Sequence, residues 1–228
     1  MSRACKVVVV GDGCVGKSSM IARLVSEGFN ACYGQTIGVD FYEKFVGLRG
    51  GLRLEIWDIG GQSLNSKMLC RYASEARCVL IVYDVTNRES LENAEDWLAT
   101  IEGLLGNKAT YFLVGNKADL LRDRQVSKQD HDRFLRERPQ FSRGFLVSAA
   151  SGDMLTRPLY QAAFLSLGTR LTDNELAIHD KVLTVTVDTD NHHDEHRLPD
   201  ADRIEAEDLE AERRMQRRLN RRCACTLS

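Results

Sequence analysis

A glycine-rich octapeptide near the amino terminus constrains this chain more than any other feature. It has the sequence GDGCVGKS at residues 11–18 and directly follows the apolar run 7–10. Glycines at this spacing let successive backbone N–H groups turn inward around phosphates, which predicts a strand before the loop and a helix after it. Lys17 is placed to reach the β- and γ-phosphates of a nucleotide, and Ser18 to offer a hydroxyl to Mg²⁺. A ligand-free glycine turn is the alternative.

The residues expected to contact phosphate lie in this loop, together with the residue that follows it. They are Gly11, Asp12, Gly13, Cys14, Val15, Gly16, Lys17, Ser18 and Ser19.

A second motif indicates the base of the nucleotide. The apolar segment 110–115 is typical of a buried strand, and it ends in Asn116, Lys117, Ala118 and Asp119. A carboxylate at Asp119 can accept hydrogen bonds from both N1–H and the 2-amino group of guanine. Adenine would leave that carboxylate unpaired, at a cost of about 1–3 kcal/mol or more. The motif predicts guanine specificity and argues against an ATPase or a small-molecule kinase.

A third segment predicts a sensor for the γ-phosphate. The alternating segment 52–57 indicates a strand, and Asp58, Ile59, Gly60, Gly61 and Gln62 follow it. Asp58 can hold Mg²⁺ through water, Gly61 can give its N–H to a γ-oxygen, and Gln62 can orient an attacking water as the catalytic residue. The alternative is a Gly-Gly turn at a strand end. The expected metal-binding residues are Ser18, Thr36 and Asp58.

Strand and helix patterns alternate along the first 168 residues, which predicts an α/β fold with a mostly parallel six-stranded sheet and helices on both faces. A hairpin near Gly50 and Gly51 adds one antiparallel edge. Strands are expected at 5–10, 40–48, 52–58, 78–84, 110–115 and 143–148. Helices are expected at 17–26, 65–74, 88–105, 127–137 and 153–168.

Across residues 3–168 the chain resembles the Ras superfamily of small GTPases and, within it, the Rab family. Residues 37–41, with the sequence IGVDF, resemble the Rab signature after the first switch. Most Rabs carry Thr-Ala where this chain has Ile59 and Gly60, and Glu where it has Ser63. The string at 57–62 resembles the divergent branch numbered twenty-eight among the Rabs. The resemblance implies a P-loop GTPase fold, with GTP or GDP and Mg²⁺ bound.

The same resemblance implies further site residues. Phe29 matches an aromatic at the base edge, and Tyr33 joins it as a nucleotide contact. Ser148, Ala149 and Ala150 replace the family's Ser-Ala-Lys, so the Ala149 N–H is expected on guanine O6 without the lysine stem beside the base. The residues implied for the effector surface are Ile37, Phe41, Trp57 and Tyr72. The three aromatics among them can equally fill the core.

The resemblance also implies partners. An exchange factor, a GTPase-activating protein, Rab-type effectors and a prenyl transferase are expected, and no nucleic acid. Residues 29–36 contain no arginine that could act as a finger in cis, so hydrolysis without an activating protein is expected to be slow. A nucleotide-bound scaffold with little turnover is the alternative function.

The domain organisation is predicted as a GTPase domain at 1–170 followed by a hypervariable tail at 171–228. With 43% hydrophobic and 28% charged residues, the chain lies in the globular range, and about 170 residues suffice for one α/β core. The tail is polar and expected to be largely disordered, with a helix predicted over 201–222. The amino terminus leads directly into a strand, and no apolar stretch reaches about 18 residues, so we expect a cytoplasmic protein.

The last four residues, CTLS at 225–228, fit a prenylation pattern with Cys225 as the lipidated residue. Cys223 leaves two alternatives open, a double prenylation or a palmitoylation. One prenyl chain gives only reversible membrane binding, so a second signal is expected. Six arginines between 213 and 222 can supply it at about 1 kcal/mol each near an anionic surface. These features predict attachment to the cytosolic face of an endomembrane, with the endosome or Golgi favoured.

Overall fold

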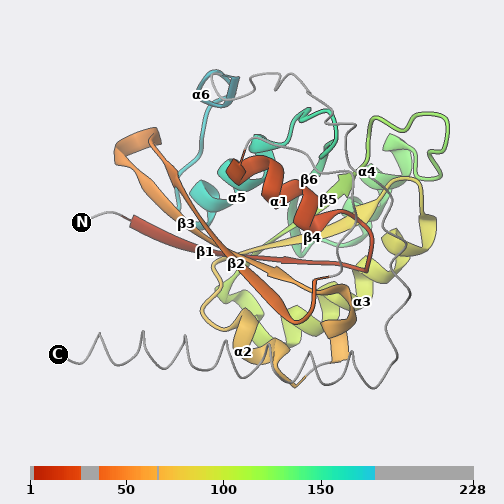
Figure 1. Cartoon of the computed structure of the whole chain (residues 1–228), viewed down its shortest axis with the longest axis horizontal. Helices are drawn as coiled ribbons and strands as arrows, with labels where there is room; N and C mark the ends of the chain where they lie inside the picture. The colour runs from red at the N-terminus through yellow and green to blue at the C-terminus, as the bar shows by residue number, and fades with distance from the viewer. Residues whose placement is uncertain (1–2, 27–35, 66, 178–228) are drawn as a thin grey trace, which may run out of the picture. The chain divides into compact units, whose positions relative to one another are not determined.

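The computed structural model describes residues 3–26, 36–65 and 67–177. Its centre is a six-stranded sheet with the strand order β2-β3-β1-β4-β5-β6 (Figure 1). β2 and β3 pair antiparallel, and all other neighbours pair parallel, which confirms the predicted sheet. The strands are β1 (Arg3–Val10), β2 (Val39–Val46), β3 (Leu52–Ile59), β4 (Cys78–Asp84), β5 (Thr110–Asn116) and β6 (Phe141–Leu146).

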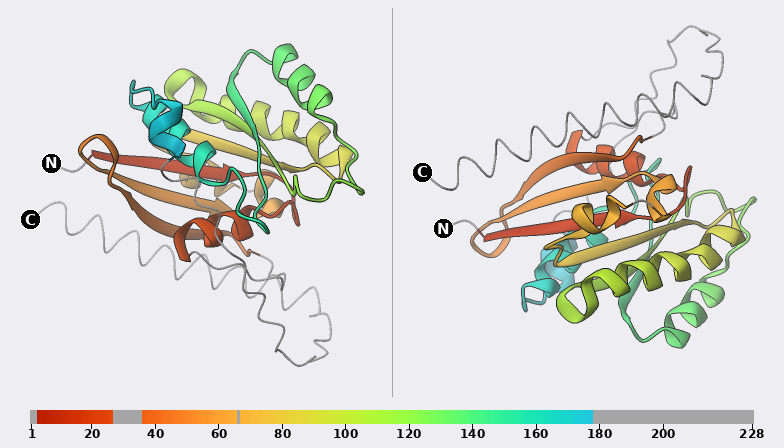
Figure 2. Two further views of the ribbon diagram at one scale, coloured as in Figure 1. Left: turned by 90° about the horizontal axis from the view of Figure 1, so that it is seen from above. Right: turned by 90° about the horizontal axis from the view of Figure 1, so that it is seen from below.

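Helices cover both faces of the sheet. α1 and α5 pack on one face, and α2 and α3 lie on the other (Figures 1 and 2). The helices are α1 (Lys17–Ser26), α2 (Leu69–Ala73), α3 (Arg88–Leu105), α4 (Lys128–Glu137), α5 (Thr156–Ser166) and α6 (Asp173–Ala177), with 3₁₀ turns η1 (Leu48–Gly50), η2 (Gly61–Asn65) and η3 (Gly106–Lys108). None of the described helices combines the length and the apolar character needed to cross a membrane.

The central strands are buried along almost their whole length. Every residue of β4 is buried, as are residues 7–10 of β1 and 111–116 of β5. Strands covered by helices on both faces consist of nearly continuous apolar runs, and this is why their positions were predictable. Their carboxyl ends lie at one edge of the sheet, where the three sequence motifs follow.

Helix ends show where prediction was less accurate. The helix expected over 153–168 covers only 156–166, because Met154 has a φ of 54° and Gly168 a φ of 73°, neither of which is helical. Within the helix expected over 65–74, α2 covers only 69–73, and the 3₁₀ turn η2 precedes it at 61–65.

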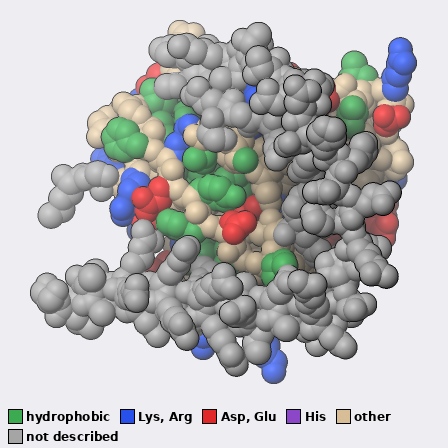
Figure 3. Space-filling model, viewed as in Figure 1, with side chains coloured by type: hydrophobic (Ala, Val, Ile, Leu, Met, Phe, Trp, Pro, Cys, Tyr) green, Lys and Arg blue, Asp and Glu red, His purple; other side chains and the backbone are tan. Residues whose placement is uncertain are grey.

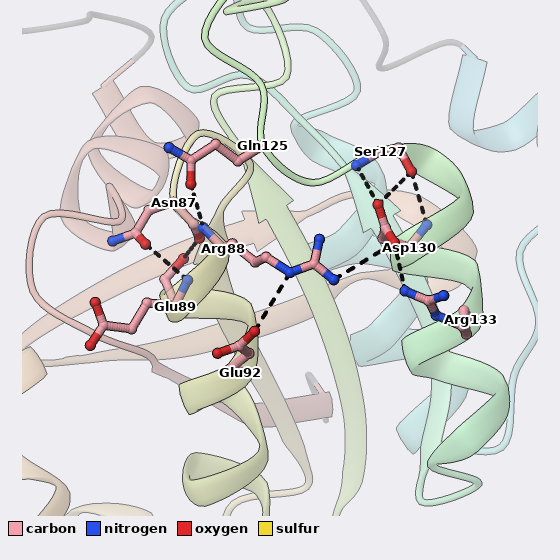
Figure 4. A network of polar contacts seen from close by, with 9 residues as sticks. Asn87, Arg88, Glu89, Glu92, Gln125, Ser127, Asp130 and Arg133 are labelled. Carbon is pink, nitrogen blue, oxygen red and sulfur yellow. Dashed lines mark hydrogen bonds and ion pairs between the residues drawn. The ribbon is translucent and has the colours of Figure 1, made fainter.

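The amino-terminal ends of α3 and α4 are capped and joined to each other (Figure 4). The side chain of Asn87 caps α3 by accepting a hydrogen bond from the N–H of Glu89, at 3.0 Å. Ser127 and Asp130 form a reciprocal capping box at the start of α4. The guanidinium of Arg88 lies 3.9 Å from the Asp130 carboxylate, so it links the two ends.

Residues 171–177, which were expected in the tail, pack on the domain. Leu176 is fully buried in the main hydrophobic core, and Leu171 is buried with it. Glu175 accepts hydrogen bonds from Thr172 at the start of α6 and forms an ion pair with Arg49 of η1, at 2.7 Å. The sequence contains this signal as Thr172-x-x-Glu175, a capping box followed by an apolar residue. The expected helix over 201–222 and both Cys223 and Cys225 lie outside the described residues.

Candidate nucleotide-binding site

The glycine-rich loop joins the end of β1 to the start of α1, as its sequence predicted. Two of its glycines are required by close packing and backbone conformation. A Cβ on Gly11 (φ 139°) would overlap the carbonyl oxygen of Val82, and one on Gly16 (φ 90°) would overlap the side-chain nitrogen of Asn116. A Cβ on Gly13, by contrast, would have no atom within 4 Å.

The other loop positions divide between core and surface. Val15 is 2% exposed and belongs to the main core, so it anchors the loop. Cys14 is exposed and has a φ of 62°, and Ser19 is half-buried in the first turn of α1.

Lys17 holds a positive charge at the centre of this loop. Its ammonium group donates hydrogen bonds to the carbonyl oxygens of Gly11, at 2.8 Å, and Asp12, at 2.7 Å, and the residue is only 6% exposed. Burial lowers the pKa of Lys17, while the carboxylates of Asp58 and Asp12 act in the opposite direction. A buried lysine surrounded by backbone groups of a glycine-rich loop is the arrangement that binds phosphate.

Three oxygen-bearing side chains from separate segments meet beside the loop. The Ser18 hydroxyl lies 2.5 Å from Oδ2 of Asp58 and 2.7 Å from the Thr36 hydroxyl. Asp58 is fully buried, its Oδ1 has no hydrogen-bond partner, and burial raises its pKa to about 6. Two hydroxyls and a buried carboxylate with an unused oxygen fit a hard divalent cation such as Mg²⁺. The described residues contain no group of three His, Cys, Asp or Glu side chains that could hold a metal.

The segment 60–62 lies against both the loop and Thr36. A Cβ on Gly61 would overlap the backbone nitrogen of Gly13 and lie 2.5 Å from the carbonyl carbon of Asp12. The Gly60 N–H donates to the carbonyl oxygen of Gly38, at 2.9 Å. A Cβ on Gly60 would lie 2.5 Å from the carbonyl oxygen of Thr36, so an alanine at this position would not permit the approach.

Gln62, the expected catalytic residue, is exposed at the edge of the same arrangement. Its side-chain nitrogen donates a hydrogen bond to the carbonyl oxygen of Thr36, at 3.0 Å. The side chain therefore lies beside the segments predicted to contact the γ-phosphate and the metal.

Asn116 connects the phosphate loop to the segment expected at the base. It is 1% exposed, its Nδ2 donates to the carbonyl oxygen of Val15 at 2.9 Å, and its Oδ1 accepts from the N–H of Ala149 at 3.0 Å. This Ala149 N–H is the group that the family resemblance implies for guanine O6, and that role stays a prediction.

Two of the remaining residues expected at the base follow Asn116 in the chain. Lys117 has a φ of 63° and its ammonium lies 2.6 Å from the Asp84 carboxylate, while Asp119 is exposed. Sequence reasoning missed Asp84. Its signal was a carboxylate at the end of a buried strand, where the register pairs it with Asn116.

The loop after β6 completes this end of the site. The Ser148 hydroxyl oxygen accepts from the Ser151 N–H at 2.9 Å, and Ala150 is half-buried. Phe29 and Tyr33 lie outside the described residues.

The residues expected on an effector surface differ in their exposure. Trp57 is 8% and Tyr72 2% exposed, so both fill the core in this structure. Ile37 and Phe41 are half-buried, and the Phe41 ring contacts Trp57 edge-on with 5.5 Å between centroids. Hydrophobic side chains gather near β2 in the space-filling view (Figure 3).

Comparison with known proteins decides the family. The chain matches the model of the Ras family over residues 6–163, more than half its length. It belongs to the Ras family of small GTPases. It is 38% identical to the Ras-related protein Rab-28 of Caenorhabditis elegans over 176 residues, 75% of this chain and 70% of that protein. These matches confirm the resemblance to the Rab family.

Two further Rab proteins are similar. The rat Ras-related protein Rab-13 is 31% identical over 74% of this chain and 84% of that protein. Rab-4 of Dictyostelium discoideum is 37% identical over 58% of this chain, which spans 65% of that relative. The family binds GTP and GDP and hydrolyses GTP, so this chain is a GTPase, as its sequence predicted.

Gly61 and Gly13 should respond differently to an added methyl group. We expect Gly61→Ala to lower the affinity for GTPγS about tenfold relative to GDP, since its Cβ has no room against Gly13 and must displace segment 60–62. Gly13→Ala should change neither affinity more than about twofold, because its Cβ meets open space. Displacement of a fluorescent GDP analogue measures both. Equal effects of the two variants would contradict the observed packing.

Proposed function

We propose that this GTPase is a membrane-anchored Rab-type switch that binds GTP or GDP with Mg²⁺, hydrolyses GTP slowly and recruits effectors in vesicle trafficking. The observation that carries the proposal is the meeting of Ser18, Thr36 and Asp58 from three separate segments. Thr36 and Gly61 lie on segments that contact each other and the phosphate loop. A γ-phosphate with Mg²⁺ would stabilise that contact, and hydrolysis would remove it.

We infer the roles at the nucleotide from the sequence motifs together with these contacts. Lys17 and the loop amides would contact the phosphates, while Ser18, Thr36 and Asp58 would hold Mg²⁺, which would neutralise phosphate charge when bound. Asp119 accepts from guanine, as predicted from its carboxylate. Asn116 holds the base segment on the phosphate loop through its bonds to Val15 and Ala149. The other proposed nucleotide contacts are Phe29, Tyr33, Ser148, Ala149 and Ala150.

Gln62 orients the attacking water in this proposal. Its side chain is exposed beside Thr36, and residues 29–36 provide no arginine to stabilise the transition state. In Ras, an activating protein that supplies such an arginine accelerates hydrolysis about 10⁵-fold, and we expect a dependence of this kind.

Substitution of Gln62 tests the switch directly. Gln62→Leu removes the group that orients water and leaves the binding residues intact, so GTP affinity should stay within about twofold while single-turnover hydrolysis slows about tenfold or more. Ser63→Ala, a change at the adjacent buried hydroxyl, serves as control. If wild type and Gln62→Leu hydrolyse GTP at the same rate, Gln62 does not take part in the mechanism. If bound GTP stays unhydrolysed in both, the nucleotide-bound scaffold is favoured.

The effector surface and the membrane anchor complete the proposal. Ile37 and Phe41, half-buried beside the switch segments, are the accessible part of the proposed effector surface, with Trp57 and Tyr72 beneath it. The proposed tail carries the lipid at Cys225, with Cys223 as a second acceptor, and its arginines bind anionic lipid. An endosomal or Golgi membrane is the proposed location. Exchange factors, activating proteins and a prenyl transferase are the proposed partners.

Anchoring depends on Cys225 if this proposal holds. We expect the prenylated full chain to sediment with vesicles containing phosphatidylserine, and Cys225→Ser to remain in the supernatant, because stable anchoring takes two signals and the arginines supply only one. Cys70→Ser, at an exposed thiol of the domain, is the matched control. Sedimentation of Cys225→Ser at wild-type levels would overturn the lipid assignment.

A further inference from the structure

The carboxylate of Asp12, inside the phosphate loop, is bonded to helix α3. Its Oδ1 accepts from the indole N–H of Trp97 at 2.9 Å, and its Oδ2 accepts from the side-chain amide of Asn93 at 2.8 Å. Asn93 and Trp97 lie one helical turn apart on the same face of α3. Trp97 is 1% exposed, so its indole N–H depends on this acceptor.

Helix α3 is a firm support for these two donors. Its first turn is capped by Asn87, and the Arg88 N–H donates to the side-chain oxygen of Gln125 at 3.2 Å. The Arg88 side chain links this end to Asp130 of α4 (Figure 4). The position of Asp12 is therefore set by an element outside the phosphate loop.

The backbone of Asp12 faces the switch segment. Its carbonyl oxygen accepts from Lys17, and the peptide between Asp12 and Gly13 is the surface against which Gly61 packs without room for a Cβ. A shift of this peptide would therefore move the contact surface of Gly61. The side-chain bonds of Asp12 oppose such a shift.

Phosphate binding alone does not account for a carboxylate at this position. A negative charge within the loop opposes a phosphate, and the cost falls only because two donors neutralise part of the charge. An apolar residue would avoid that cost but would leave the buried indole N–H of Trp97 without an acceptor, and a neutral amide could not accept from both Trp97 and Asn93 as the two carboxylate oxygens do.

We propose that Asp12, Asn93 and Trp97 are positioning residues that set the preference for GTP over GDP. By holding the peptide between Asp12 and Gly13, they place the surface that Gly61 needs to reach the γ-phosphate. This inference rests on the proposed role of Gly61. Gly61 faces the γ-phosphate, which GDP lacks, so the network is expected to affect GTP affinity more than GDP affinity.

The test compares GTPγS and GDP affinities in the full chain with Mg²⁺, by displacement of a fluorescent GDP analogue. Asp12→Asn presents an amide N–H to one of the two donors, and Trp97→Phe removes the indole donor. Each should lower GTPγS affinity by at most about tenfold, which corresponds to the full worth of one hydrogen bond to a charged group, and should lower GDP affinity less. Asp96→Asn, the same substitution at an exposed residue of α3, should change neither.

The double variant separates positioning from general stability. With Phe at position 97, an asparagine at position 12 can accept from Asn93 and no longer faces the indole N–H. Adding Asp12→Asn to Trp97→Phe should therefore cost less than about twofold further. If Asp12→Asn does not fold, Asn93→Ala replaces it as the second single variant, with the same expected loss.

The outcomes are distinct. Equal losses for GDP and GTPγS, or fully additive losses in the double variant, overturn the inference and leave the proposed function standing. Failure of the wild-type chain to bind either nucleotide overturns both.

Discussion

The side-chain amide of Asn116 is the interaction on which the rest of the site depends. It is buried at the end of β5 and bonds to Val15 in the phosphate loop and to Ala149 after β6. Three loops that are far apart in the sequence are thereby held at one edge of the sheet. Gly16 is required for this contact, because a Cβ there would overlap the amide itself. The close approach of the Gly16 backbone and the hydrogen bonds of Asn116 together fix the phosphate loop against the end of β5.

Around this fixed part lie two segments with weaker attachment. Thr36 reaches the site through its hydroxyl and carbonyl, and Gly61 packs on the phosphate loop without a side chain. Thr36 is half-buried and Gln62 is exposed, whereas Asn116 is 1% exposed. Segments that are less buried than the core are those that a ligand can order and release. The packing therefore divides the site into two parts. We call residues 116–119 and 148–150 the fixed base side, and residues 36–38 and 60–62 the responsive phosphate side.

Much of this arrangement was predictable because the motifs follow buried strands whose apolar runs are unambiguous. Other features depend on contacts that no local pattern encodes. One is the burial of Tyr72. Another is the pair of hydrogen bonds that Asn93 and Trp97 donate to Asp12, which join segments far apart in the sequence. The docking of α6 through Leu176 was missed because four polar residues, at 172–175, precede it, although its capping box was readable.

Hydrogen exchange of backbone amides, measured on the full chain with Mg²⁺ and either GDP or GTPγS, is the sharpest test of this division. We predict that residues 36–38 and 60–62 exchange on the order of tenfold more slowly with GTPγS, while 116–119 and 148–150 exchange equally in the two states. Equal exchange at 36–38 and 60–62, or a difference confined to 116–119, would contradict the division between a fixed base side and a responsive phosphate side.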